Sequence, residues 1–238
     1  MSQKPFIFKN FTVHQDQCAM KIGTDSVILG AWASVNRSPY SILDIGAGTG
    51  VLAMMLAQRT SAEIIDAVEV DATAYEQCVY NFEHSPWSNR LFCYHASLQV
   101  FADEIEDKYE LIISNPPFYT EDYKSLSYSR DLARFNDALP FEHLLESVSK
   151  LLSETGQFTV IIPFQKKSDF ISLASHYGLF PKRTLNVKGN LNSPIKRCVL
   201  EFSFDKNDMS TEELIIETER HQYTKEYIHL TKDFYLKM

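Results

Sequence analysis

The sequence predicts an α/β fold: a seven-stranded, mostly parallel sheet with helices on both faces and an antiparallel final strand pair. Three observations predict it. Strand-like and helix-like stretches alternate from about residue 41, the order that a parallel sheet with crossover helices produces. The chain has 238 residues, 45% of them hydrophobic, which is enough for the core of one larger domain. The last two predicted strands are joined by a connection too short for a helix.

Seven short apolar and β-branched runs predict the strands, at residues 41–45, 64–70, 91–94, 111–114, 158–162, 185–187 and 199–204. Stretches with helical spacing predict helices at residues 51–59, 73–83, 141–152 and 167–177. The loop 188–194 joins the last two strands, so we expect them to be antiparallel. Asp25 can cap an earlier helix that ends at Trp32, and residues 224–235 predict a final amphipathic helix.

Composition and charge exclude several classes of protein. A net charge of −8 argues against a protein that coats nucleic acid nonspecifically. The N-terminus lacks a signal-peptide pattern, and no segment approaches the ~18 apolar residues of a membrane span. We therefore expect a cytoplasmic protein with no membrane partner. The four cysteines form no CxxC pair, and we expect reduced packing residues and no metal site: Cys18, Cys78, Cys93 and Cys198.

The charge is unevenly distributed. Residues 170–200 contain no Asp or Glu but hold five basic residues: Lys182, Arg183, Lys188, Lys196 and Arg197. On charge alone, a solvated face is the favoured interpretation of this basic stretch.

A glycine-rich loop, DIGAGTG at residues 44–50, follows the first strand and opens a helix. Glycines allow a tight turn and close approach of the backbone to a ligand. The spacing is GxGxG, not the GxGxxG of dinucleotide sites, and it suits an amino-acid-bearing nucleoside better than a pyrophosphate. Glu69 ends the second strand about 20 residues later, where a carboxylate can accept ribose hydroxyls. Asp71 is expected to start the next helix.

These features resemble the class I Rossmann-like methyltransferases, over about residues 23–204. The resemblance implies S-adenosylmethionine as cofactor, with Glu69 on its ribose. It also implies that the glycine loop surrounds the methionine part through Asp44, Gly46, Gly48 and Gly50. The family commonly has an acid after strand three that bonds the cofactor's adenine amine. This chain has His95-Ala96-Ser97-Leu98 there, so Ser97 or a backbone carbonyl is expected to substitute.

The fourth strand runs into Asn115-Pro116-Pro117-Phe118, the most specific signal in the chain. This NPPF motif resembles the (D/N)-P-P-(Y/F) motif of amino methyltransferases. The Asn115 side-chain oxygen and the Pro116 carbonyl can accept the two hydrogens of an exocyclic amine, while the prolines fix the backbone. Phe118 offers a stacking face for a base removed from its own stack. We expect Asn115 to lie beside the cofactor as well.

Three acceptors fit this motif: adenine N6, guanine N2 in rRNA, and the side-chain amide of a protein glutamine. The glutamine enzymes usually end the motif in Tyr and carry a helical N-terminal domain, whereas only about 40 residues precede the glycine loop here. The segment 21–32, KIGTDSVILGAW, resembles the bacterial tRNA1(Val) adenine-N6 methyltransferases, which modify the adenine beside the anticodon. That resemblance places Thr24 and Asp25 near the cofactor's methionine end, although a plain helix cap explains them equally well.

Aromatic and basic residues follow the motif, and we expect three to contact tRNA: Tyr128, Arg130 and Arg134. Once the amine-binding motif is taken into account, we favour an RNA-facing surface over a solvated face for the basic stretch. We expect Lys196 and Arg197 to contact the tRNA. We expect one methyltransferase domain, residues 1–238. It comprises a segment 1–40 that gates substrate and cofactor, a catalytic core 41–204 and a C-terminal helical extension 205–238. A monomer is favoured. A nicotinamide dehydrogenase and a noncatalytic cofactor-binding module are the alternatives from other classes.

Overall fold

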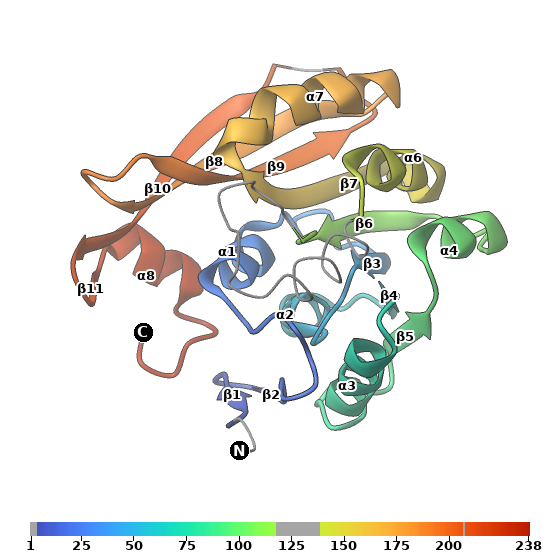
Figure 1. Cartoon of the computed structure of the whole chain (residues 1–238), viewed down its shortest axis with the longest axis horizontal. Helices are drawn as coiled ribbons and strands as arrows, with labels where there is room; N and C mark the ends of the chain where they lie inside the picture. The colour runs from blue at the N-terminus through green and yellow to red at the C-terminus, as the bar shows by residue number, and fades with distance from the viewer. Residues whose placement is uncertain (1–3, 118–138, 207) are drawn as a thin grey trace, which may run out of the picture.

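The computed structural model describes residues 4–117, 139–206 and 208–238. A nine-stranded sheet runs through the molecule in the order β11-β10-β8-β9-β7-β6-β3-β4-β5 (Figure 1). Its strands are β3 (Ser41–Ile45), β4 (Ile64–Glu69), β5 (Leu91–His95), β6 (Tyr109–Ser114), β7 (Leu152–Pro163), β8 (Phe180–Asn190), β9 (Ile195–Ser203), β10 (Ser210–Glu219) and β11 (Gln222–Tyr223). A separate hairpin pairs β1 (Phe6–Ile7) with β2 (Thr12–Val13).

The parallel part of the sheet aligns the ends of its strands. β3 pairs in parallel with β4 on one side and with β6 on the other, and Ile45 lies opposite both Val68 and Ser114. β5 and β7 extend this parallel arrangement outward. The residues that follow β3, β4 and β6 therefore meet at one edge of the sheet, where ligands bind in folds of this kind.

The antiparallel final strand pair is confirmed. β9 runs antiparallel to both β8 and β7, and the loop between β8 and β9 contains no helix. The sheet has two strands more than the seven predicted, because β10 adds in parallel to the free edge of β8 and β11 pairs with β10.

The predicted helical extension 205–238 is therefore wrong in its first half. Within the described residues of that range, helix is confined to α8 (Lys225–Thr231), and β10 occupies residues 210–219 of the first half. An unpaired edge of β8 would leave a row of backbone donors and acceptors exposed, which pairing with β10 satisfies.

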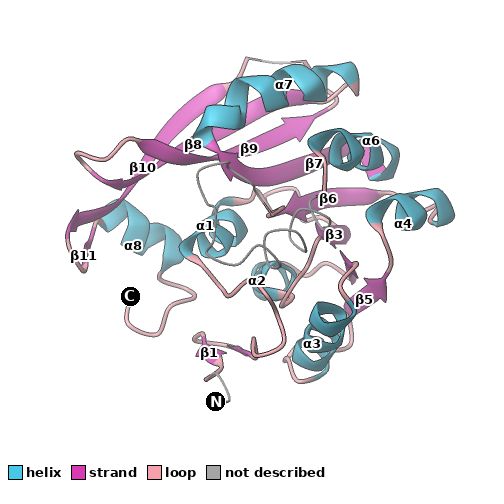
Figure 2. Ribbon diagram, in the orientation of Figure 1, coloured by secondary structure: helices cyan, strands magenta, loops and turns pink. Residues whose placement is uncertain are grey.

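The helices form two layers around the sheet (Figure 2). One layer holds α1 (Thr24–Trp32), α2 (Val51–Arg59), α3 (Ala72–Glu83) and α8, and the other holds α4 (Leu98–Glu104), α6 (Phe141–Leu151) and α7 (Lys167–His176). Each layer packs its own apolar cluster against the sheet. Helices on both faces are thus confirmed. None of the helices in the described ranges is long and apolar enough to cross a membrane.

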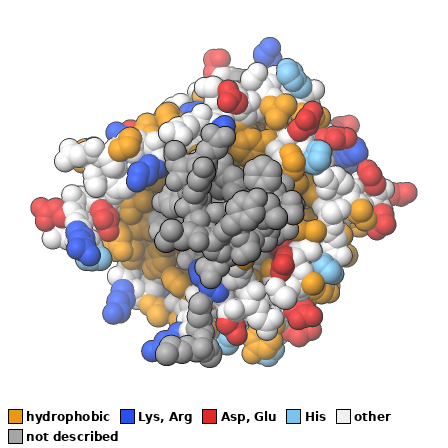
Figure 3. Space-filling model, in the orientation of Figure 1, with side chains coloured by type: hydrophobic (Ala, Val, Ile, Leu, Met, Phe, Trp, Pro, Cys, Tyr) orange, Lys and Arg blue, Asp and Glu red, His pale blue; other side chains and the backbone are white. Residues whose placement is uncertain are grey.

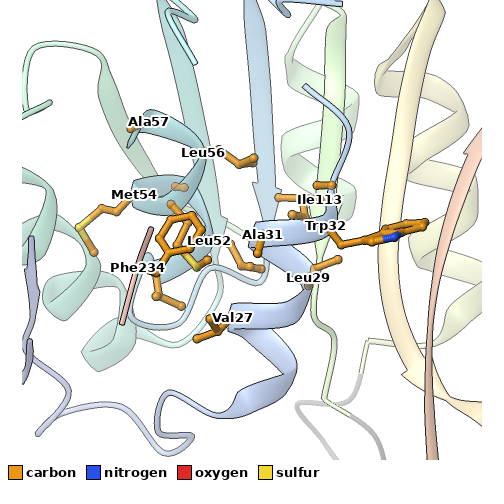
Figure 4. Packing of buried hydrophobic residues seen from close by; sticks show 14 of the residues in the cluster. Val27, Leu29, Ala31, Trp32, Leu52, Met54, Leu56, Ala57, Ile113 and Phe234 are labelled. Atoms are coloured by element: carbon orange, nitrogen blue, oxygen red, sulfur yellow. The ribbon is translucent and has the colours of Figure 1, made fainter. Parts of the chain in front are cut away.

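Helix α1 packs against α2 at Gly30. A Cβ built on Gly30 would lie 2.8 Å from the Met55 Sδ and 3.2 Å from the Met55 Cβ, so a larger residue there would require Met55 to shift. Figure 4 shows Ala31 of α1 beside Leu52 of α2, with Trp32 directed toward the sheet. At the end of α1, Arg59 donates to the carbonyls of Gly30 and Ala33 at 2.7 and 2.8 Å.

The expected cap of α1 is wrong. The helix starts at Thr24 after Gly23, which provides no side-chain cap, and Asp25 lies inside the first turn. The Asp25 carboxylate instead accepts a hydrogen bond from Arg197 Nε at 2.9 Å. Because Asp25 lies inside the helix and not at the position before it, its carboxylate pairs with this guanidinium and does not cap the helix.

Candidate active site

The carboxyl edge of the sheet brings the glycine loop and the Asn-Pro-Pro turn together. The loop follows β3, and Asn115 follows β6, the neighbouring strand. The Ser114 hydroxyl donates to the Ile45 carbonyl at 2.9 Å, directly before both segments. This buried hydrogen bond ties the start of the glycine loop to the start of the Asn-Pro-Pro turn.

The three glycines of the loop all have positive φ angles, of 71° at Gly46, 53° at Gly48 and 75° at Gly50. A Cβ at Gly46 or Gly48 would meet no atom of the described chain within 4 Å. At Gly50 it would lie 2.5 Å from the Phe82 ring and 2.8 Å from the Cys78 Sγ. Gly46 and Gly48 therefore border open space, whereas Gly50 serves packing of the loop against α3.

Glu69, at the end of β4, braces the loop from the side. One carboxylate oxygen accepts the Gly48 N–H at 2.8 Å, and the other accepts the N–H groups of Val70 and Asp71 at 2.8 and 2.9 Å. A carboxylate has about four acceptor positions, so it can still accept from a ribose hydroxyl. The bracing of Gly48 was not predicted. The expected start of the next helix is confirmed, because Asp71 caps α3 by accepting from the Ala74 N–H at 2.8 Å.

Asp44 is fully buried beneath the loop. One of its oxygens accepts the Ala53 N–H at 3.1 Å, and the other has no hydrogen-bond partner among the described residues. Burial and, to a smaller extent, the nearby Glu69 charge together raise the pKa of Asp44 to about 7, against the lowering effect of the Ala53 hydrogen bond. Two buried carboxyl groups close to glycines that border open space suit a ligand that is positively charged. S-adenosylmethionine, with its sulfonium and ammonium groups, fits this set of residues.

The Asn-Pro-Pro turn presents Asn115 toward α1. Asn115 is partly exposed, Pro116 is buried and Pro117 is partly exposed. The Asn115 side-chain amide donates from Nδ2 to the Ser26 Oγ at 2.9 Å. Among the described residues, none donates to the carbonyl oxygen of that amide, so this oxygen can accept from a ligand. Sequence reasoning missed Ser26, since nothing in the local pattern links positions 89 residues apart.

The remaining predicted cofactor residues lie at the same edge but have other partners. Ser97 follows β5 and caps α4 by accepting from the Val100 N–H at 3.3 Å. Thr24, exposed in the first turn of α1, borders an aromatic cavity of about 500 Å³ with Tyr223, Tyr227 and Tyr235.

The basic stretch is divided between the two ends of β8 and β9. Arg197 opens β9 beside the end of β7 and pairs with Asp25, and Lys196 next to it is exposed. Arg183 lies at the opposite end, where it pairs with the buried Glu201 at 2.8 Å and covers the Trp32 ring at 4.0 Å. Acidic and basic side chains are interspersed around the face seen in Figure 3. The basic stretch is therefore not one continuous surface.

Four predicted site residues lie outside the described residues: Phe118, Tyr128, Arg130 and Arg134.

Comparison with known proteins adds the family context. The family model "Methyltransferase small domain" matches residues 33–178. The chain is 58% identical to a tRNA1(Val) (adenine(37)-N6)-methyltransferase of Flavobacterium psychrophilum, over 98% of this chain and 100% of that protein. It is 54% identical to the protein of the same name from Christiangramia forsetii, over the full length of both.

Among solved structures, the chain is similar in fold to a protein described as a predicted O-methyltransferase of Agrobacterium tumefaciens. The TM-score is 0.68 at 20% identity, covering 88% of this chain and 96% of the other. A ribosomal protein L11 methylase of Lactobacillus delbrueckii gives a TM-score of 0.53 at 14% identity, covering 76% and 77%. Both likenesses concern the fold, and they confirm the Rossmann-like arrangement predicted from the sequence.

Proposed function

Because the chain belongs to the family of tRNA1(Val) (adenine(37)-N6)-methyltransferases, we propose that it methylates the N6 amine of adenine 37 in tRNA1(Val). The methyl donor is S-adenosylmethionine. The observation that carries the proposal is the identity of 58% over practically the whole length of both chains. The arrangement of the carboxyl edge supports it, since the glycine loop and Asn115 directly follow two neighbouring strands, β3 and β6.

S-adenosylmethionine supplies an electrophilic methyl group on a sulfonium when it is bound. We propose that Gly46 and Gly48 leave room for it, with Glu69 toward its ribose. The buried Asp44 provides negative potential below the loop once it ionises. Thr24, Asp25, Gly50 and Ser97 lie at the same edge, and we propose that they support this site.

An exocyclic adenine amine is a weak nucleophile, because its lone pair is delocalised into the ring. We propose that the Asn115 Oδ1 and the Pro116 carbonyl accept the two amine hydrogens. Two acceptors aimed in one direction direct the nitrogen lone pair toward the methyl and stabilise the positive charge that develops on the nitrogen. No base with a shifted pKa is required at the amine, because its proton can leave after transfer. Phe118 is the proposed stacking face for the base.

For the tRNA, we propose phosphate contacts by Lys196 and by Arg197, with further contacts from Tyr128, Arg130 and Arg134. Lys196 is exposed beside the pair formed by Arg197 and Asp25, at the edge that carries Asn115. Phosphate contacts position an RNA, while the amine site selects the base.

The alternatives are guanine N2 in rRNA and a protein glutamine amide, both of which Asn115 can serve. The test is radiolabelled methyl transfer to unmodified tRNA1(Val), total rRNA and a protein extract, followed by mass spectrometry of the digested products. N6-methyladenosine at position 37 is expected. Label in N2-methylguanosine or in protein, with unlabelled tRNA, would contradict the proposal.

A further inference from the structure

We propose that Ser26 is a positioning residue, which fixes the orientation of the Asn115 side-chain amide for methyl transfer. This inference rests on the proposed function, because it concerns the residue that accepts hydrogens from the target amine.

The amide of Asn115 has two ends of nearly equal shape but opposite chemistry. Its oxygen accepts hydrogen bonds, whereas its nitrogen only donates them. Rotation of the amide by half a turn would present N–H groups to the target amine in place of the acceptor. The site therefore requires a neighbour that bonds the nitrogen end and holds the amide plane in place.

Ser26 is that neighbour. Its Oγ lies 2.9 Å from the Asn115 Nδ2 and accepts a hydrogen from it. With the nitrogen held by Ser26, the oxygen at the other end of the amide is directed away from α1 and stays available. The bond is partly buried, so water competes with it less than on an open surface.

The serine is held in place by the packing of its helix. From Val27 to Trp32, every residue of α1 is buried, and Gly30 allows close contact with Met55 of α2. Arg59 bonds two carbonyls at the far end of the helix. Figure 4 shows this helix beside α2, on the same face of the sheet. A hydroxyl on such a helix has little freedom to follow a rotating amide.

The same turn of α1 is held from a second direction. Asp25, directly before Ser26, accepts a hydrogen bond from Arg197 of β9 at 2.9 Å. The first turn is thus connected to β6 through Asn115 and to β9 through Arg197, and both connections lie at the carboxyl edge of the sheet. Helix α1 therefore carries the residue that positions Asn115, and two contacts hold its first turn at the carboxyl edge.

The experiment measures single-turnover methylation of unmodified tRNA1(Val) by Ser26→Ala and Ser26→Thr variants. For Ser26→Ala we expect a loss of about tenfold in the rate at saturation, the fold-change that one hydrogen bond of about 1.4 kcal/mol provides. The KM for tRNA and the Kd for S-adenosylmethionine should change less than twofold. Ser26→Thr keeps the hydroxyl and should restore most of the rate. Ser149→Ala is the matched control, because Ser149 is a partly exposed serine on another helix, α6.

A double-mutant cycle separates positioning from a structural role. In the Asn115→Ala background there is no amide to orient, so adding Ser26→Ala should lower the residual rate less than twofold. An equal tenfold loss in both backgrounds, or a wild-type rate for Ser26→Ala, would overturn the inference. If the wild-type protein itself does not methylate adenine 37, the proposed function fails first. Thermal melting of each variant identifies any loss of folded protein.

Discussion

Gly48→Ala should weaken cofactor binding without unfolding the protein. Gly48 borders open space, and a methyl group there would meet no described atom within 4 Å. Its backbone is held from the other side by Glu69, which accepts the Gly48 N–H. The added methyl would therefore occupy the space that we assign to S-adenosylmethionine.

The structure sets the size of the stability effect. Gly48 has a φ of 53°, a region where alanine costs about 1 kcal/mol relative to glycine. For a domain of this length, about 1 kcal/mol lowers the melting temperature by roughly 2–4 °C. The variant should therefore remain folded at 25 °C, while its affinity for the cofactor falls by at least about tenfold, since a methyl cannot share space with a ligand atom.

Gly50→Ala is the matched control in the same loop. It combines a φ of 75° with a Cβ that would lie 2.5 Å from the Phe82 ring. Overpacking adds about 1–3 kcal/mol to the backbone strain, so the melting temperature should fall by roughly 5–15 °C. The Gly48 variant thus tests the space assigned to the cofactor, and the Gly50 variant tests the packing of the loop against α3.

Calorimetric titration with S-adenosylmethionine and thermal melting test both variants. Wild-type affinity in a folded Gly48→Ala protein would refute the placement of the cofactor over this glycine. A stable Gly50→Ala protein would refute the packing role of Gly50.

Two other predictions concern charge. Asp44 keeps its proton up to about pH 7 when folded but releases it near 3.8 when unfolded, so its contribution to stability falls as pH rises from about 4 to 7. Asp44→Asn should remove this fall, raising the melting temperature of the cofactor-free protein at pH 8 more than at pH 5; an equal change at both pH values would contradict the buried-acid account. Lys196→Ala should weaken tRNA binding and reduce the slope of log Kd against log salt by about 1. With one phosphate contact fewer, binding releases fewer counterions. Filter binding from 50 to 200 mM salt measures this, with Lys150→Ala on α6 as the control, and an unchanged slope would make Lys196 a solvated residue.

Local patterns in the sequence predict most elements of the fold. Helix α2 spans Val51–Arg59 as predicted, since an apolar run directly after a glycine loop signals it locally. β8 was expected only at residues 185–187 but covers Phe180–Asn190. The charged residues at its start obscured the strand, because Arg183 is neutralised there by Glu201 and covers Trp32. Those partners are distant in the chain, so no local window contains the signal.

In the candidate site too, the sequence predicts the short motifs but not the contacts between distant segments. The glycine loop, Glu69 and the Asn-Pro-Pro turn are recognisable as short motifs, and the parallel strands place all three at one edge. Contacts between distant segments are not encoded in any motif. Ser26 meets Asn115 across 89 residues, and Asp25 meets Arg197 across 172, where the sequence favoured a helix cap. These contacts depend on the packing of α1 against the sheet, which only the tertiary structure provides.

The most direct test of the proposed mechanism is the single-turnover rate of Asn115→Ala on unmodified tRNA1(Val). If the Asn115 oxygen stabilises the amine as the methyl arrives, the rate at saturation should fall by at least ~10²-fold, the effect of removing one preorganised polar group. Binding of S-adenosylmethionine and of tRNA should change little, because the interaction is made chiefly in the transition state. A rate near wild type would contradict the assignment of Asn115 as the residue that holds the target amine.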